Sequence, residues 1–167
     1  TTAWILGLPT SESVYQGIGT TAQVARTDFY YDQVTDCNTA STNQTPTQGD
    51  LTRTVRWLSG GISPETRMAY DGYGNLICTR DASGNTTTFA SDASSTFQKV
   101  VTNALGHQTM TQYYGVDGVV TDTGLYGQVK NITTPNGEVT TTTYDSFGRK
   151  SQITYPNTLV KTFNYPC

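Results

Sequence analysis

Charged side chains are scarce in this sequence. Lysine, arginine, aspartate and glutamate make up 14% of its 167 residues, against about 25% in an average soluble domain. The formal net charge is −3, and the ten lysines and arginines are scattered along the chain. Because phosphate binding needs clustered basic side chains, the composition argues against a nucleic-acid partner.

Histidine and cysteine are also rare. The only histidine, His107, directly follows Gly106, and no nucleophile motif accompanies it, so we expect a turn residue and no catalytic base. Cys37, Cys78 and Cys167 show no CxxC spacing, so neither a metal site nor a cofactor is expected. The sequence leaves open whether one disulfide and one free thiol form or three thiols remain.

Long apolar runs and helical periods are missing. No stretch approaches the roughly 18 apolar residues of a membrane span, and no segment keeps a 3.6-residue apolar period, so we expect almost no helix. The first residues, TTAWILGLPT, have no positively charged region and no initiator methionine. This beginning indicates a mature or internal piece of a soluble protein.

Turn signals, by contrast, are abundant. In YDGYGNLICTRDASGNTTTF, residues 70–89, aspartate stands three residues before glycine twice, at Asp71 and Gly74 and at Asp81 and Gly84. Type I turns favour aspartate at the first position and glycine at the fourth. The segment between the two turns has the length and composition of one strand, so the stretch predicts alternating strands and turns.

The same kind of turn recurs about every ten residues, with β-prone segments between the turns. The sequence therefore predicts an all-β fold of consecutive antiparallel β-hairpins, with about twenty residues per pair of turns. Tyrosine precedes one kind of turn, at Tyr70 and Tyr144. Keeping the two kinds in alternation requires residues 115–126 to form a single enlarged turn. The further predicted turn residues are Asn103, Gly106, Asn136, Gly137, Asp145 and Gly148.

The chain is expected to divide into leading strands with a polar loop at residues 1–50 and a hairpin array at residues 51–167. Residues 33–50 are polar and of low complexity. We expect them to form an exposed, mobile excursion.

Two stretches carry a family resemblance. Residues 70–89 read Tyr-Asp-x-x-Gly-x-Leu and then Asp-x-x-Gly-Asn-x-x-x-Phe, and residues 141–157 read TTTYDSFGRKSQITYPN. Over residues 51–165 the chain resembles the YD repeats of RHS proteins, of the B and C components of insecticidal toxin complexes, and of teneurins. WILGLPTS and RTDFYYD, near the start, are similar to the beginning of such arrays.

The resemblance implies a curved ribbon of hairpins that forms part of a hollow β-shell. In toxin relatives the shell encloses an effector, and in teneurins it belongs to an extracellular adhesion receptor. The implied function is structural and non-enzymatic, in a secreted or cell-surface protein. The implied partners are the rest of the shell, or neighbouring copies joined through edge strands, and an enclosed effector.

The sequence also contains candidate residues for two other kinds of chemistry. Asp71, Asp81, Asp122 and Asp145 could pair for glycoside hydrolysis, but three of them begin DxxG turns. Residues 117–124 resemble a calcium loop but lack alternate acidic ligands and a closing glutamate.

The alternative function is an adhesion or carbohydrate-binding module. It would use exposed tyrosines, with Tyr114 and Tyr126 as candidate glycan contacts near the enlarged turn. The N-glycosylation motif occurs at Asn43, Asn85 and Asn131. Finally, the uncharged beginning of the chain predicts self-association, with Trp4, Ile5 and Leu6 buried where a neighbouring strand is added.

Overall fold

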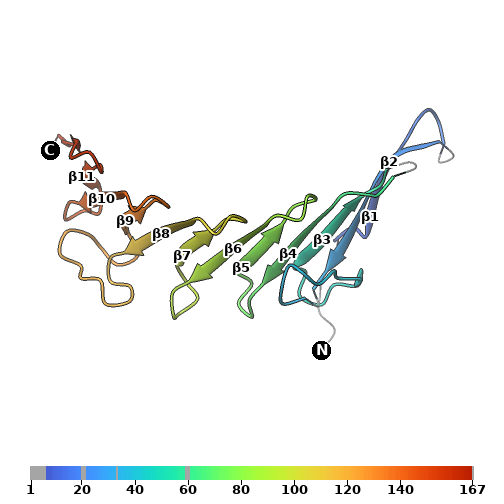
Figure 1. Cartoon of the computed structure of the whole chain (residues 1–167), viewed down its shortest axis with the longest axis horizontal. Coiled ribbons are helices and arrows are strands. Elements are labelled where there is room, and N and C mark those ends of the chain that lie inside the picture. The colour runs from blue at the N-terminus through green and yellow to red at the C-terminus, as the bar shows by residue number, and fades with distance from the viewer. Residues whose placement is uncertain (1–6, 20–21, 33, 59–60, 167) are drawn as a thin grey trace. The chain divides into compact units, whose positions relative to one another are not determined.

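The computed structural model describes residues 7–19, 22–32, 34–58 and 61–166 (Figure 1). All regular secondary structure within these ranges is β-strand. The prediction of an all-β fold built from consecutive antiparallel hairpins is confirmed. The predicted junction residues Trp4, Ile5 and Leu6, and the third cysteine, Cys167, lie outside the described residues.

The chain divides into two compact units between Thr87 and Thr88. In the first unit each strand pairs antiparallel with the next one in the sequence. Its strands are β1 (Ser11–Tyr15), β2 (Gln23–Tyr31), β3 (Leu51–Arg56), β4 (Glu65–Tyr70) and β5 (Leu76–Arg80).

The second unit continues the same pattern, with antiparallel pairing between successive strands. Its strands are β6 (Thr86–Ser91, which begins just before the division), β7 (Gln98–Thr102), β8 (Gln108–Tyr113), β9 (Val129–Thr133), β10 (Val139–Tyr144), β11 (Lys150–Thr154) and β12 (Val160–Thr162). β8 pairs directly with β9, so residues 115–126 lie within one long connection, as predicted. Figure 1 shows this connection as the large loop after β8.

The short hairpins share one turn geometry. At Asp71, for example, the carbonyl accepts a hydrogen bond from Gly74 N–H at 3.1 Å, and Asp71 N–H donates to the Asn75 carbonyl at 2.9 Å. Gly74 has a φ of 85°. This is a type I turn followed by a left-handed residue, a common way to close a three-residue hairpin loop. The same pair of bonds and a positive φ recur at the turns that begin at Asp81, Asn103, Thr134, Asp145 and Tyr155.

The two ends of the strands differ. In the connections that follow an even-numbered strand, the register shifts beside the last residue of that strand. These residues are Tyr31, Tyr70, Ser91, Tyr113 and Tyr144. Among the connections at the opposite ends of the strands, the one between β1 and β2 also has a shift, beside Tyr15, whereas β7 and β8 pair without one. Such irregularities increase the local twist of the strands.

Few apolar side chains are buried. Among the described residues only Tyr31, Cys37, Ala69, Cys78, Tyr114 and Val116 are buried apolar ones. Cys37, Ala69 and Cys78 form one cluster, where the β2–β3 loop covers the sheet, and most residues of the strands are only partly buried.

The loop between β2 and β3 differs from the expectation. Cys37 and Ser41 are each only 2% exposed, and a disulfide joins Cys37 to Cys78 on β5. The prediction that residues 33–50 form an exposed excursion is therefore wrong for Cys37 and Ser41, although other residues of the loop, such as Asp36 and Thr39, are exposed. The cause is long-range: Arg67 Nη1 donates to the Asn38 carbonyl, and Arg53 Nη1 donates to the Ser41 carbonyl at 3.2 Å.

Asp32 fixes the end of the same loop. The residue is 6% exposed, and its carboxylate accepts hydrogen bonds from the backbone N–H groups of four successive residues and from one hydroxyl. The donors are Thr47 N and Oγ1, Gln48 N, Gly49 N and Asp50 N, at 2.5 to 3.1 Å. Burial alone would raise the pKa of Asp32, but these hydrogen bonds outweigh it, and the net pKa is lowered.

Candidate functional site

The aspartates of the turns are occupied by their own backbone. Asp71 Oδ1 accepts from Tyr73 N and Asn75 N, both at 2.9 Å, and Asp81 Oδ1 does the same with Ser83 N and Asn85 N. Hydrogen bonds, first of all from the Asn75 side chain, lower the pKa of Asp71. A carboxylate held ionised in this way is unsuited to general acid catalysis.

Two further predicted turn residues, Asn103 and Asp145, accept backbone hydrogen bonds in the same way. Asn103 Oδ1 accepts from Leu105 N and His107 N, and Asp145 Oδ1 accepts from Phe147 N and Arg149 N. Asn136 occupies the third position of the turn that begins at Thr134. The predicted turn glycines, Gly74, Gly84, Gly106, Gly137 and Gly148, all have a φ between 76° and 89°.

One turn aspartate was missed as an individual residue. Asp92 begins a longer loop that ends at Phe97, and its carboxylate accepts from the N–H groups of Ser94, Thr96 and Phe97. These hydrogen bonds strongly lower the pKa of Asp92, and the one from the backbone N–H of Phe97 contributes most. The pattern of aspartate followed by glycine does not mark this turn, because serine stands at position 95, where φ is 54°.

Tyrosine hydroxyls tie the hairpins together. Tyr113 donates to the Gln98 carbonyl at 2.8 Å, Tyr144 to the Val129 carbonyl at 3.0 Å and Tyr165 to the Lys150 carbonyl at 3.0 Å. In each case the tyrosine lies at the end of one strand or just after it, and the carbonyl belongs to the first residue of the preceding strand. At these three positions the tyrosine hydroxyl therefore has a structural role, whereas the Tyr70 hydroxyl contacts Met68 Sδ on its own strand, at 3.8 Å.

The enlarged turn packs around Tyr114. This side chain is 0% exposed. Its hydroxyl lies 2.8 Å from Thr123 Oγ1 and donates to the Thr142 carbonyl at 3.0 Å. The prediction of Tyr114 as a glycan contact is therefore wrong: β8 ends at Tyr113, and the chain then folds the next side chain under the loop.

Tyr126, the other candidate, is 66% exposed. Its ring lies edge-on to Phe97, with centroids 5.6 Å apart, and Phe97 also packs on Tyr113 at 5.0 Å. Two glycines permit this arrangement. A Cβ on Gly115 would lie 2.6 Å from the Tyr126 ring, and one on Gly124 would lie 2.3 Å from the Tyr114 ring.

The acidic residues of this loop pair with lysines. Asp117 forms an ion pair with Lys99 on β7, and Asp122 lies 3.5 Å from Lys130 on β9. Lys130 also lies over the Tyr114 ring, 5.0 Å from its centroid. Among the described residues no group of three or more His, Cys, Asp or Glu could hold a metal ion. The carboxylates considered for calcium serve instead to fasten the loop to the sheet.

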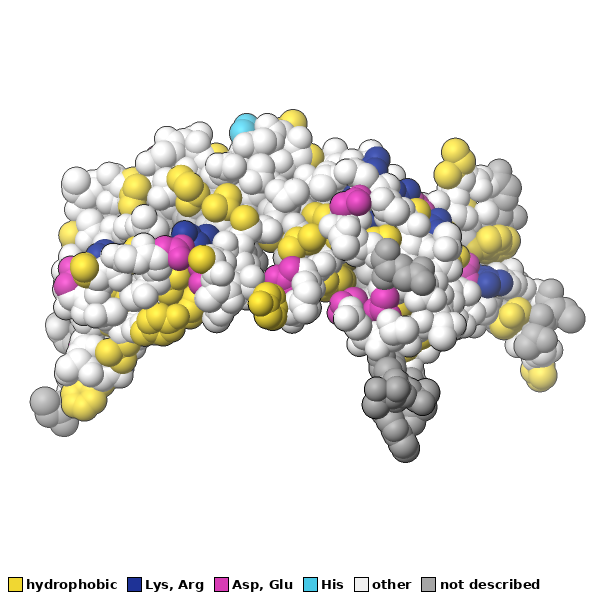
Figure 2. All heavy atoms as spheres, turned by 90° about the horizontal axis from the view of Figure 1, so that it is seen from below, with side chains coloured by type: hydrophobic (Ala, Val, Ile, Leu, Met, Phe, Trp, Pro, Cys, Tyr) yellow, Lys and Arg dark blue, Asp and Glu magenta, His cyan; other side chains and the backbone are white. Residues whose placement is uncertain are grey.

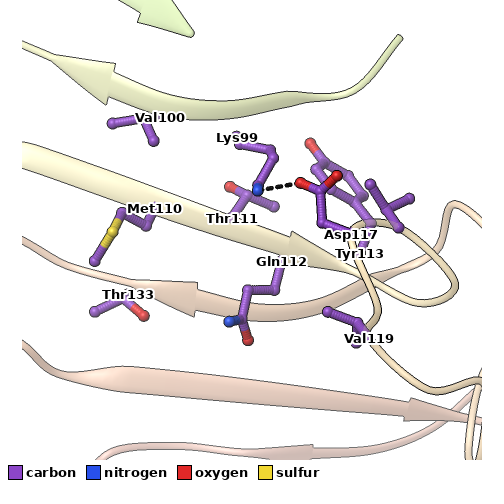
Figure 3. A pocket seen from close by; sticks show the side chains of 10 residues that line it. Lys99, Val100, Met110, Thr111, Gln112, Tyr113, Asp117, Val119 and Thr133 are labelled. Atoms are coloured by element: carbon purple, nitrogen blue, oxygen red, sulfur yellow. Dashed lines mark hydrogen bonds and ion pairs between the residues drawn. The ribbon is translucent and has the colours of Figure 1, made fainter. Parts of the chain in front are cut away.

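A hollow of about 250 Å³ lies beside the enlarged turn (Figure 3). Met110 and Gln112 on β8, Val119 of the loop and the ion pair of Lys99 with Asp117 line it. Its volume is slightly below that of ordinary small-molecule pockets, about 300–1,000 Å³. None of the polar side chains that line it is buried, so nothing in it marks a ligand site.

The remaining candidates lie at the surface or in turns. His107 is exposed (Figure 2, cyan), and its carbonyl accepts from Asn103 N–H at 3.0 Å. The amide nitrogens of all three glycosylation motifs donate hydrogen bonds: Asn43 to Tyr31 O and Thr45 O, Asn85 to Asp81 Oδ2, and Asn131 to Gln112 Oε1. In the described part of the chain no helix is long and apolar enough to cross a membrane.

One segment of the chain, which contains β9, β10, β11 and their turns, matches a known protein family. Residues 126–160 match the family model described as RHS Repeat. This segment is therefore similar to an RHS repeat. The matched segment includes the turn that begins at Asp145 and the Tyr144 hydroxyl bond.

Among solved structures, the crystal structure of TcdB2-TccC3-Cdc42 is similar to 94% of this chain, with 14% sequence identity and a TM-score of 0.47. The chain spans 8% of the length of the matched chain in that structure. None of the curated proteins matches.

Proposed function

We propose that this chain is a stretch of wall in a larger RHS-type β-shell. The observation that carries the proposal is the run of hairpins closed by one turn geometry and tied by tyrosine hydroxyls. Such a unit can be repeated without limit, because each new hairpin needs only the strand before it. The result is extended sheet area with no central core.

The sparse core supports the same role. Stable domains bury the apolar side of one layer against another. In the described residues only six apolar side chains are buried, whereas large ones such as Met110 and Ile132 are 44% and 42% exposed on the strands. We infer that the sheet is completed by the rest of a shell or by neighbouring copies, and that one face is turned toward an enclosed effector.

The proposed role is non-enzymatic. The carboxylates that could pair for hydrolysis accept backbone hydrogen bonds in their turns, and the carboxylates of the enlarged loop pair with lysines. We assign no residue a catalytic role.

The disulfide supports a secreted or cell-surface location. Disulfides form and persist in oxidising compartments and are rare in the cytosol. Non-reducing peptide mapping of the protein from its natural source would test this. We expect a cross-linked peptide pair containing Cys37 and Cys78, and free thiols at both positions would contradict the proposed location.

Electron cryo-microscopy of the full natural gene product tests the shell proposal itself. We expect a hollow particle in which these strands continue edge to edge into further hairpins. A map in which this segment stands alone as a separate domain, with both terminal strands free in solvent, would overturn the proposal.

A further inference from the structure

A second hollow lies in the first unit, away from the enlarged turn. It has a volume of about 590 Å³ and is lined by Gln23, Arg26, Asp28 and Trp57. The hollow is wide and open to solvent, so it would contact one side of a ligand and leave the other side in water. Neither the turn pattern nor the RHS repeat, which matches residues 126–160, accounts for this group of side chains.

The strand register places these side chains on one face. Trp57 N–H donates to the Arg26 carbonyl at 2.8 Å, which extends the pairing of Thr27 with Arg56 by one residue. Trp57 is therefore directly opposite Arg26, and opposed residues lie on the same face of a sheet. Asp28 lies two residues after Arg26 in β2, so it is on that face too. Ser13 of β1 is opposite Arg26, so a hydroxyl, a guanidinium and an indole form one row across three strands.

The Arg26–Asp28 ion pair fixes these two side chains, but other polar atoms of the hollow have no hydrogen-bond partner in the described part of the protein. Arg26 Nε and Nη2 both donate to Asp28 Oδ1, at 2.8 and 2.7 Å. Within the described residues, Asp28 Oδ2, the Gln23 amide and the Trp57 indole N–H make no hydrogen bond to the protein. Trp57 remains 38% exposed, although tryptophan has the largest apolar surface to lose by burial.

We propose that this hollow, the Trp57 site, binds a neutral sugar. A pyranose ring has one face of C–H groups, which packs on an indole, and a rim of hydroxyls that both donate and accept hydrogen bonds. The free carboxylate oxygen of Asp28 can accept from such a hydroxyl, and the Gln23 amide can donate and accept. Preorganisation by the Arg26 pair reduces the entropy lost on binding.

The charge of the site selects the class of sugar. Because Arg26 and Asp28 neutralise each other in a salt bridge, the pair gives no net attraction to an acidic or a basic ligand. A sulfated or uronic-acid sugar would be attracted by Arg26 but repelled by Asp28, and an amino sugar with a free ammonium would experience the reverse, so neither charge gains net affinity. Neutral hexoses and N-acetylhexosamines fit without an unpaired charge.

A printed array of neutral hexose and N-acetylhexosamine oligosaccharides, followed by calorimetric titration with the strongest ligand, tests the proposal. Trp57→Ala should weaken binding roughly tenfold or more, because a central aromatic anchor is lost. Trp57→Phe should keep most of the affinity, since a stacking ring remains. Tyr126→Ala serves as the control and should bind like the wild type.

Thermal melting of Trp57→Ala within a few degrees of the wild type would show that the loss of binding is not a loss of fold. Three results would overturn the proposal: no neutral ligand on the array, equal binding by Trp57→Ala, or loss of binding in Tyr126→Ala instead. None of these results bears on the shell proposal, which rests on the hairpins and their edges.

Discussion

Single turn residues set the geometry of the hairpins, and the turn at Asp71 allows a matched comparison. Gly74 has a φ of 85°, whereas its neighbour Gly72 does not have a positive φ. A Cβ added at either position would meet nothing within 4 Å. Any difference between substitutions at the two sites must therefore come from the backbone conformation and not from crowding.

We expect Gly74→Ala to lower the free energy of unfolding by about 1–2 kcal/mol, the cost of a left-handed conformation in an L-residue. Gly72→Ala should be neutral or slightly stabilising, because it restricts only the unfolded chain. Urea unfolding followed by circular dichroism measures both. Equal midpoints for the two variants would show that the positive φ carries no energetic cost.

Local sequence could indicate these turns because all their partners lie within five residues. Asp71 needs only Tyr73, Gly74 and Asn75 to complete its bonds. Tyr114 is different: its partner, the Thr142 carbonyl, is 28 residues away. Nothing local distinguishes Tyr114 from the exposed Tyr126, so sequence proposed both as ligand contacts and was wrong about the first.

Loops are the elements in which distant contacts decide the structure. Sequence predicted the enlarged turn correctly from the alternation of the hairpins. It missed the packing of residues 34–50, because a polar composition does not reveal that Asp32 will accept four backbone N–H groups. The cysteine pairing also needed the structure, since three cysteines permit three different pairs.

Asp32 should make the β2–β3 loop sensitive to acid. Its pKa in the folded protein is lowered, below about 3.9 in an unfolded chain. Its stabilisation is therefore complete above about pH 5 and is lost as the pH falls through 4 toward the folded pKa. The pKa of Asp50 is shifted the other way. Burial is the larger cause of this increase and the negative charge of Asp32 is the smaller one.

Asp32→Asn should cost about 2 kcal/mol at pH 7, where charged hydrogen bonds are lost, and its difference from the wild type should shrink below pH 4. Asp50→Asn, the matched control, should not destabilise the protein at pH 7. Urea midpoints at pH 7, 5 and 3 measure both effects. A constant gap between Asp32→Asn and the wild type at all three pH values would refute this explanation.

The disulfide holds the same loop against β5. Cys37 and Cys78 are 41 residues apart, and closing a loop of that length stabilises the fold by about 4 kcal/mol in the chain-entropy model. We expect Cys37→Ala/Cys78→Ala to unfold at lower urea concentration and to be cut first by protease within residues 34–50. Cleavage that still begins elsewhere would show that the hydrogen bonds of Asp32, Arg53 and Arg67 suffice to hold the loop.

On the scale of the whole molecule, the strand order ends in β1 and β12. Each has a described strand partner on one side only. Unpaired backbone groups at such edges recruit further strands unless charge, proline or an irregularity prevents it. Val14 on β1 and Val160 on β12 are 50% and 53% exposed, and neither edge strand carries more than one charged residue.

The most direct measurement of the central claim is sedimentation velocity of the isolated chain at tens of micromolar. If the chain is wall material with open edges, it should form species larger than the 18.1 kDa monomer. Val14→Lys and Val160→Lys should shift it toward monomer, whereas Val120→Lys, at a 62% exposed loop position, should not. A wild-type chain that sediments as a monomer at these concentrations would contradict the claim.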